Sequence, residues 1–232
     1  MPDSPAILLV HGAWHGAWCW DAVRSALEAR GREVHTVDLP TVHAPDKAEL
    51  GMLDDAAAVR AAVDAIDGPV VVVAHSYGGV PTTQGLAGAG NVVHIVFIAA
   101  FVLDAGESLL GSVGGVAPSW WTVDGALTTA GNPDEPAESL FFNDVPEAEA
   151  RAAAARLLPQ ATKPFTDVVT QVAWKEIPST YVITERDAIF PLVAEEALAG
   201  RAGSAVHRLD TGHSPFLSQP EATAALIDAA GR

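Results

Sequence analysis

The sequence predicts an α/β fold built on a mostly parallel six-stranded sheet with helices on both faces. Six short runs rich in Val, Ile and Leu alternate along the chain with segments of helical periodicity. Several runs, such as 6–10 (AILLV) and 69–74 (PVVVVA), are apolar at almost every position, so both faces of the strand must be covered. Strands that are buried on both faces and separated by helices are typical of parallel sheets.

Turn residues mark the ends of several elements. Gly31 follows the helical segment 17–30, as a glycine after a helix end would, and Pro40 follows the strand 33–39. The expected strands lie at 6–10, 33–39, 69–74, 92–101, 179–184 and 205–209. The expected core helices lie at 17–30, 54–66, 192–200 and 220–230.

One segment interrupts this alternation. Between residues 104 and 177 the sequence shows no convincing core strand, and it holds Gly-rich and Trp-rich stretches with a helix expected near 146–158. We therefore expect residues 1–103 and 178–232 to form the core, and residues 104–177 to form a cap (lid) inserted after the fourth strand. The carboxyl edge of a parallel sheet is a usual place for a substrate pocket. The alternative is that this insertion has only a structural role and forms no part of a substrate pocket.

The charge balance argues against two classes of partner. The 232 residues carry 13 Lys and Arg against 29 Asp and Glu, a formal net charge of −16. Nucleic acids and anionic membranes are bound by basic surfaces, so neither is an expected partner. The longest apolar run, 95–103, is too short to span a bilayer. Cys19 is the single cysteine, and residues 1–4 lack the pattern of a signal peptide, so we expect a cytoplasmic protein.

The strongest chemical signal lies at residues 70–79 (VVVVAHSYGG), where a buried strand runs into a small-x-Ser-x-Gly-Gly turn. This pattern is the nucleophile elbow G-x-S-x-G with Ala74 in place of the first glycine. Small residues are needed at Ala74, Gly78 and Gly79 because a helix and a strand approach closely there. The sequence therefore predicts Ser76 as a nucleophile; the alternative is a serine that caps an ordinary strand-to-helix turn.

A serine hydroxyl needs a base, and the base needs a carboxylate that orients it. His213 follows the last expected strand in DTGHSP, and Asp187 follows the fifth in TERDAIFP. The resulting chain order Ser, Asp, His is the one expected when parallel strands each present a loop at one sheet edge. Glu185 and Asp104 are the alternative acids.

A third motif, HGAWHGAW, follows the first strand. A loop at this place supplies one backbone N–H to an oxyanion hole, and the residue after the nucleophile supplies the second. By position the two donors are Ala13 and Tyr77, acting through the main chain. Trp14 of the same loop is an expected substrate contact, with plain packing as the alternative.

Taken together, these motifs resemble the α/β-hydrolase family over nearly the whole chain outside the cap. HGAWHGAWCW, AHSYGG, TERDAIFP and DTGHSPFLSQP resemble the plant hydroxynitrile lyase and methylesterase group and its bacterial esterase relatives. The resemblance implies Ser76, Asp187 and His213 as a catalytic triad, with Ala13 and Tyr77 as oxyanion donors. It also implies that the antiparallel hairpin that usually opens the family's sheet is missing here, and it suggests a homodimer.

The sequence departs from the hydroxynitrile lyases of this group at two positions. Those enzymes resemble each other in a lysine directly after the catalytic histidine and in a threonine in the first oxyanion loop. Here Ser214 follows His213, and the loop reads HGAW without a threonine. Loss of a cationic group for cyanide disfavours a lyase, although a lyase or a specialised biosynthetic enzyme that uses the triad for acid–base chemistry remains the alternative. A catalytically silent binding protein is a third possibility.

The expected function is therefore a serine hydrolase that cleaves carboxylic esters through an acyl-enzyme, with a small-molecule ester as its partner. No metal-ligand spacing is apparent, and acyl transfer by a triad requires no cofactor. Aromatic residues of the cap segment suit an uncharged, apolar substrate of small to medium size. Trp120, Trp121 and Phe190 are the expected contacts, besides Trp14.

Overall fold

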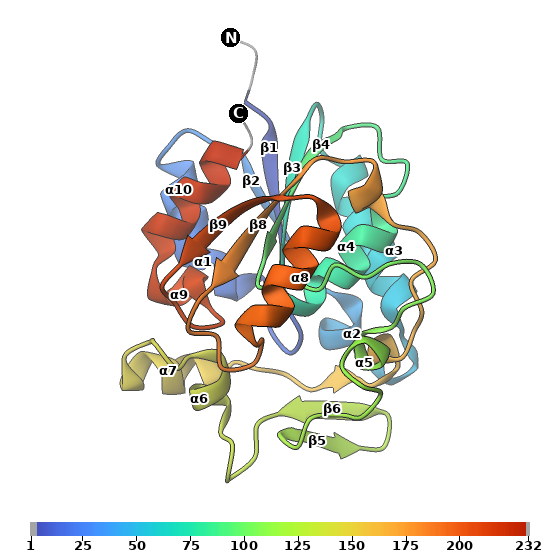
Figure 1. Ribbon diagram of the computed structural model, residues 1–232, viewed down its shortest axis with the longest axis vertical. Coiled ribbons are helices and arrows are strands. Elements are labelled where there is room, and N and C mark those ends of the chain that lie inside the picture. The colour runs from blue at the N-terminus through green and yellow to red at the C-terminus, as the bar shows by residue number, and fades with distance from the viewer. Residues whose placement is uncertain (1–3, 231–232) are drawn as a thin grey trace.

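The computed structural model describes residues 4–230. The expectation about a signal peptide falls mainly on residues 1–3, which lie outside the described residues, as do 231–232. Within the described chain, six strands form one sheet in the order β2-β1-β3-β4-β8-β9, and every neighbouring pair is parallel (Figure 1). This confirms the predicted fold class. The strands are β1 (Ala6–Val10), β2 (Val34–Val37), β3 (Val70–His75), β4 (Val92–Ile98), β8 (Ser179–Thr184) and β9 (Ala205–Leu209).

Both faces of the central strands are buried because their side chains alternate between two cores. Leu8 of β1 and Val72 of β3 belong to one apolar cluster, whereas Ile7 and Val71 belong to the other. Helices α3, α4 and α8 contribute to the first cluster, and α1 and α10 to the second. These helices are α1 (Asp21–Glu28), α3 (Met52–Asp64), α4 (Gly79–Gly85), α8 (Leu192–Ala202) and α10 (Pro220–Ala230).

The order of the strands reverses next to β1. The chain passes from β1 to β2 on one side, then returns to β3 on the other side and continues outward to β4 and β8. The two central strands end within one residue of each other, since Val10, the last residue of β1, pairs with Ala74, the residue before the end of β3. The loops that follow β1 and β3 therefore leave the sheet side by side, at the type of position where open α/β sheets bind ligands.

Residues 104–177, called the cap segment below, contribute no strand to the main sheet among the described residues. Three short strands of this segment pair antiparallel as a second sheet in the order β5-β6-β7, which the sequence patterns did not reveal. Figure 1 shows them with α6 and α7 beyond the carboxyl ends of the main strands. The elements are α5 (Leu109–Ser112), β5 (Trp121–Asp124), β6 (Leu127–Ala130), α6 (Ala137–Phe141), α7 (Glu147–Ala154), β7 (Gln160–Ala161), η4 (Lys163–Phe165) and η5 (Ala173–Lys175).

Several expected elements have other bounds in the structure: 33–39 corresponds to β2 (Val34–Val37), 54–66 to α3 (Met52–Asp64) and 146–158 to α7 (Glu147–Ala154). The strand expected over 92–101 stops at Ile98, because Ala99 adopts a φ of 43°, outside the strand region. The helix expected over 17–30 begins as the 3₁₀ turn η1 (Ala17–Trp20) and ends at Glu28. The remaining short elements are α2 (Pro40–His43), η2 (Lys47–Glu49), η3 (Ser76–Gly78) and α9 (Pro215–Ser218). Among the described helices, none combines the length and apolar character that crossing a membrane requires.

Candidate active site

Ser76 lies at the sharp turn between β3 and η3. Its φ is 50°, a left-handed conformation that is uncommon for residues other than glycine. The Ser76 carbonyl accepts a hydrogen bond from the Phe101 N–H at 3.1 Å, which holds the strained residue in place. A Cβ on Gly78 would lie 2.5 Å from the His11 carbonyl oxygen, so the turn can pack against the loop after β1 only if this residue is glycine.

Asp187 and His213 meet at the same edge of the sheet, in the loops after β8 and β9. The Nδ1 of His213 lies 2.6 Å from Oδ2 of Asp187, and both side chains are buried. The other carboxylate oxygen of Asp187 accepts the N–H groups of Ile189 and Phe190 at 2.7 and 2.8 Å. Burial acts to raise the pKa of Asp187, but the His213 ring and these donors hold it below its ordinary value. Asp187 is therefore ionised at neutral pH.

The two alternative acids lie elsewhere. Glu185 is exposed and forms an ion pair with Arg208 at 3.5 Å. Asp104 accepts a hydrogen bond from the Lys175 ammonium at 2.6 Å. Of the three carboxylates weighed from the sequence, Asp187 is the one that contacts His213.

His75 joins the serine turn to the histidine loop, a contact that sequence reasoning missed. Its Nε2 donates to the His213 carbonyl oxygen at 2.8 Å, and the two rings lie 4.6 Å apart. Burial lowers the pKa of His75 well below its ordinary value, so the ring is neutral. The sequence signal that could have pointed to this contact is the position of His75 directly before Ser76, at the end of a fully buried strand.

The Nε2 atom of His213 is available to act as a base. Its Nε2 makes no hydrogen bond with any described residue, and none joins it to the Ser76 hydroxyl. Because Asp187 occupies Nδ1 as an acceptor, the neutral ring carries its proton there and leaves the Nε2 lone pair free. Hydrogen bonds between a base and a nucleophile are often formed only once substrate is bound.

The two predicted oxyanion donors lie on the adjacent loops after β1 and β3. The Ala13 N–H has no acceptor within residues 4–230. The Tyr77 N–H is in the first turn of η3, where N–H groups have no partner within the helix. Both residues line one cavity together with Ser76. The arrangement offers two main-chain donors beside a serine hydroxyl.

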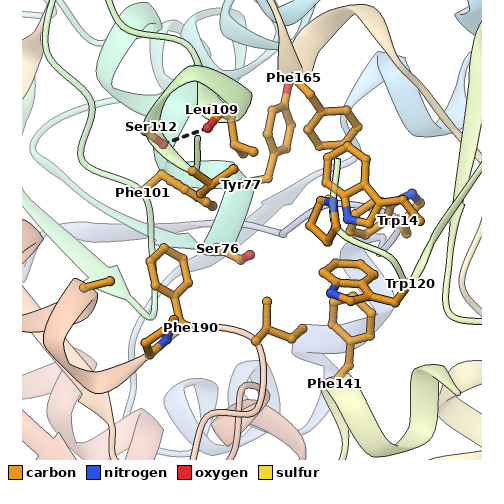
Figure 2. Close-up of a pocket in the computed structure, with 17 residues that line it drawn as sticks. Trp14, Ser76, Tyr77, Phe101, Leu109, Ser112, Trp120, Phe141, Phe165 and Phe190 are labelled. Carbon is orange, nitrogen blue, oxygen red and sulfur yellow. Dashed lines mark hydrogen bonds between the residues drawn. The ribbon is translucent and has the colours of Figure 1, made fainter. Parts of the chain in front are cut away.

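This cavity has a volume of about 430 Å³, within the range of small-molecule sites. Figure 2 shows the Ser76 hydroxyl directed into the middle of a ring of aromatic side chains. The four substrate contacts expected from the sequence, Trp14, Trp120, Trp121 and Phe190, all line it. Further apolar lining comes from residues that were not singled out as contacts, namely Phe101, Leu109, Phe141, Phe165 and Ile189.

The lining of the cavity is almost entirely apolar. Ser76 and Ser112 supply side-chain hydroxyls, while the hydroxyl of Tyr77 is turned away and donates to Asp55. No Lys, Arg, Asp or Glu is present among the described lining residues. A charged substrate group would therefore lose its hydration in this cavity without gaining a partner of opposite charge.

One cluster elsewhere has residue types that bind metals: His11, Asp38 and His43 lie within reach of one another. However, both nitrogens of His11 are already used, since Nδ1 donates to the Gly12 carbonyl at 2.8 Å and Nε2 accepts the Leu39 N–H at 3.0 Å. Burial lowers the pKa of His11 to about 4, so this ring is neutral. Main-chain partners outside the cluster thus occupy both ring nitrogens of His11.

Comparisons with known proteins agree with this fold. The model of the "Alpha/beta hydrolase family" matches residues 7–226. An alpha/beta hydrolase of Aspergillus novofumigatus is 28% identical, covering 98% of this chain and 97% of its own. Methylesterase 7 of Arabidopsis thaliana is 26% identical, covering 97% and 95%.

A solved structure shows the same architecture. The crystal structure of a pyrethroid hydrolase from Sphingobium faniae superposes with a TM-score of 0.85 at 24% identity, covering 97% of this chain and 96% of that one. This likeness shows the fold, and the two relatives above, which are named a hydrolase and a methylesterase, support a hydrolase enzyme. The chain belongs to the alpha/beta hydrolase family.

Proposed function

We propose that the chain is a serine esterase that cleaves carboxylic esters of small to medium, uncharged, apolar substrates through an acyl-enzyme. The strongest support is the placement of Ser76 in a strained turn, with its hydroxyl directed into an aromatic cavity. The fixed pair of Asp187 and His213 emerges at the same sheet edge. Similarity to a methylesterase favours an ester as the substrate.

In the proposed mechanism, His213 Nε2 takes the proton of Ser76 while Oγ attacks the ester carbonyl carbon. The electron pair of the carbonyl moves to its oxygen, and the N–H groups of Ala13 and Tyr77 bind the resulting oxyanion. Collapse of this intermediate breaks the bond to the alcohol, which leaves with the proton from His213. Water, deprotonated by His213, then attacks the acyl-enzyme and releases the acid and free Ser76. Asp187 stabilises the imidazolium in both steps.

The cavity sets the proposed substrate class. Its aromatic walls favour an acyl or aryl group that gains free energy by leaving water, about 25 cal/mol per Å² of apolar surface. Its volume suits a substrate of small to medium size. The absence of charged groups among the described lining residues disfavours acidic and basic substrates.

The alternative, lyase chemistry with the same triad, would need a group that stabilises a departing anion. The residue after His213 is Ser214, and the described lining includes no cation that could stabilise cyanide. The cavity therefore supports acyl transfer better than cyanide release. The two reactions differ in whether Ser76 becomes acylated.

The proposal is tested with p-nitrophenyl acetate, butyrate and octanoate, using wild type and Ser76→Ala in parallel. We expect wild-type turnover of at least one ester and the loss of this activity in Ser76→Ala. Incubation with a serine-directed phosphonate, followed by mass spectrometry, should show one adduct on Ser76. Ser112→Ala is the matched control, because Ser112 lines the same cavity and its variant should still be labelled.

Labelling of Ser112, or equal turnover by wild type and Ser76→Ala, would contradict the proposed nucleophile. A wild-type protein that neither turns over these esters nor reacts with the phosphonate would count against acyl-enzyme chemistry. In that case the lyase alternative would be tested next, by following the cleavage of an aromatic cyanohydrin.

A further inference from the structure

Trp14, the residue after the first proposed oxyanion donor, is bonded to the cap segment by all of its polar groups. Its N–H donates to Oε1 of Gln160 at 3.0 Å, and its carbonyl accepts the Leu158 N–H at 2.9 Å. Its indole Nε1 donates to the Thr128 carbonyl at 3.1 Å. Three hydrogen bonds thus connect Trp14 to the cap segment, and of the three cap residues involved Gln160 is the one that uses its side chain.

The backbone of this loop is strained, which explains why such contacts are needed. Trp14 has a φ of 60°, a genuine outlier for a bulky side chain. The peptide that joins Ala13 to Trp14 is held on both sides, since the Ala13 carbonyl accepts His15 Nδ1 at 2.7 Å and the Trp14 N–H donates to Gln160. A strained conformation persists only where the surroundings enforce it. The Ala13 N–H belongs to the adjoining Gly12–Ala13 peptide, which meets this one at the Ala13 Cα. Loss of the Gln160 contact would let the Ala13–Trp14 peptide rotate and would remove one restraint on the direction of the Ala13 N–H.

The other end of Gln160 leads to the second proposed donor. Its Nε2 donates to Oγ1 of Thr41 at 2.9 Å, and that hydroxyl donates to Oδ2 of Asp55 at 2.7 Å. The same carboxylate oxygen accepts the hydroxyl of Tyr77 at 2.6 Å. The four side chains are almost completely buried. The orientation of the Gln160 amide follows from its partners, because the Trp14 N–H requires an oxygen as acceptor.

We propose that Gln160 is a positioning residue for the oxyanion hole, acting through the Ala13–Trp14 peptide on one side and through Thr41, Asp55 and Tyr77 on the other. This inference rests on the proposed esterase function. Gln160 belongs to β7, so the hole has its working geometry only when this part of the cap segment is packed on the core. The cap segment thereby contributes to transition-state binding as well as to the walls of the cavity.

The test compares Gln160→Leu with Gln84→Leu. Leucine removes both polar contacts of Gln160 while keeping much of its volume. Gln84 is a matched control, because its Oε1 also ties the core to the cap segment, by accepting the N–H groups of Thr170 and Gln171 at 2.8 and 3.2 Å. Gln84 lies outside the described lining of the cavity and outside the chain of hydrogen bonds that leads to Ala13 and Tyr77. Gln160→Glu keeps an acceptor for the Trp14 N–H and serves as the conservative variant.

Two readouts separate positioning from a general loss of stability. Removing one oxyanion donor outright costs about 10²–10³ in kcat, so its displacement in Gln160→Leu should lower kcat by about 10–100-fold. KM for the p-nitrophenyl ester should stay within about threefold of wild type, because the contact acts in the transition state. Affinity for an apolar trifluoromethyl ketone, whose carbonyl becomes an oxyanion when Ser76 Oγ adds to it, should fall with kcat. Gln84→Leu should keep both values within about threefold, and Gln160→Glu should lose less than Gln160→Leu.

Equal kcat in Gln160→Leu and Gln84→Leu, or unchanged ketone affinity in Gln160→Leu, would overturn the inference while leaving the esterase proposal intact. Wild-type protein that forms no ketone adduct on Ser76 would overturn both. If Gln160→Leu does not fold, as judged by near-ultraviolet circular dichroism, Thr41→Val decides instead. That variant keeps the Trp14 contact but cuts the connection to Asp55, and full ketone affinity in it would overturn the role of the connection to Tyr77.

Discussion

The core loops and the cap segment hold their parts of the site by different forces. Asp187 and His213, in core loops, are fixed by short hydrogen bonds to each other and to the main chain. The cap aromatics are held by ring contacts, with Trp121 and Phe165 4.4 Å apart and Trp120 and Phe141 5.7 Å apart. Hydrogen bonds weaken steeply with distance and angle, whereas apolar packing tolerates changes of shape.

This difference separates chemistry from specificity. Groups that transfer a proton must lie within hydrogen-bond reach, so the core fixes them with directional bonds. Groups that enclose an apolar substrate need only the right volume, so the cap segment can exchange one aromatic residue for another. Mutations in the core loops should therefore act on kcat, and mutations in the cap aromatics should act on KM and on substrate choice.

The largest effect is expected for Asp187→Asn. An asparagine amide can present an N–H to Nδ1 of His213, which would move the ring proton to Nε2 and remove the base. By comparison with other triads, kcat should fall by about 10⁴-fold with little change in KM. Steady-state kinetics with the best p-nitrophenyl ester measure both values.

Glu185→Gln is the matched control, since Glu185 lies two residues away but pairs with Arg208 at the surface. Surface ion pairs contribute about 0–1 kcal/mol, so this variant should behave like wild type. If Asp187→Asn retains most of its activity while Glu185→Gln loses it, the orienting acid has been assigned to the wrong carboxylate.

The core was predictable because its patterns arise from local physics. Strands buried on both faces read as continuous apolar runs, as β1 does at 6–10. The predicted bounds of 179–184 and 205–209 also agree with β8 and β9, although β9 is an exposed strand at the edge of the sheet. The cap sheet was missed because its strands have two to four residues and carry polar positions. Its pairing of Trp121 with Ala130 depends on contacts that no local pattern encodes.

The candidate site divides in the same way. Ser76, Asp187 and His213 could be singled out because each lies within four residues after the end of a strand, and parallel strands bring such loops to one edge. Gln160 could not be found, because a single glutamine in a loop-rich segment has no signature. Its partners Trp14 and Thr41 are 146 and 119 residues away in sequence. His75 was visible in sequence, but the direction of its ring depends on the exact geometry of the turn.

A smaller effect is expected for Trp120→Ala in the cap segment. Trp120 packs against Trp14 with ring centroids 5.6 Å apart and lines the cavity. Its removal should raise KM for the octanoate ester by about 10-fold, through lost apolar contact, and change kcat by less than about threefold. The ratio of kcat/KM between octanoate and acetate measures the change. Val116→Ala, at an exposed cap position, is the control and should leave this ratio unchanged. A large loss of kcat in Trp120→Ala alone would contradict the idea that the cap aromatics act on KM and the core loops on kcat.

The smallest effect concerns Glu195, a buried carboxyl of α8 that lies behind the loop carrying Asp187. It interacts with Thr184, whose hydroxyl also donates to Asp187 at 3.0 Å. Burial, followed by the charge of Asp187, raises the pKa of Glu195 from 4.5 to about 8. The folded chain therefore holds a proton on Glu195 between these two values that the unfolded chain releases, so the contribution of Glu195 to stability decreases as pH rises through this window.

Glu195→Gln removes this titration while keeping a neutral side chain of the same shape. The Tm of the variant minus that of wild type should rise between about pH 5 and about pH 8 and then level off. Each kcal/mol of this difference shifts the Tm of a chain of this size by about 2–4 °C, so the rise is measurable by thermal unfolding. Esterase activity at neutral pH should stay close to wild type, since Glu195 is already protonated there and the Asp187–His213 pair is untouched. Parallel Tm curves for the two proteins would show that Glu195 is ionised in the folded state, and hence that a second negative charge lies behind Asp187 during catalysis.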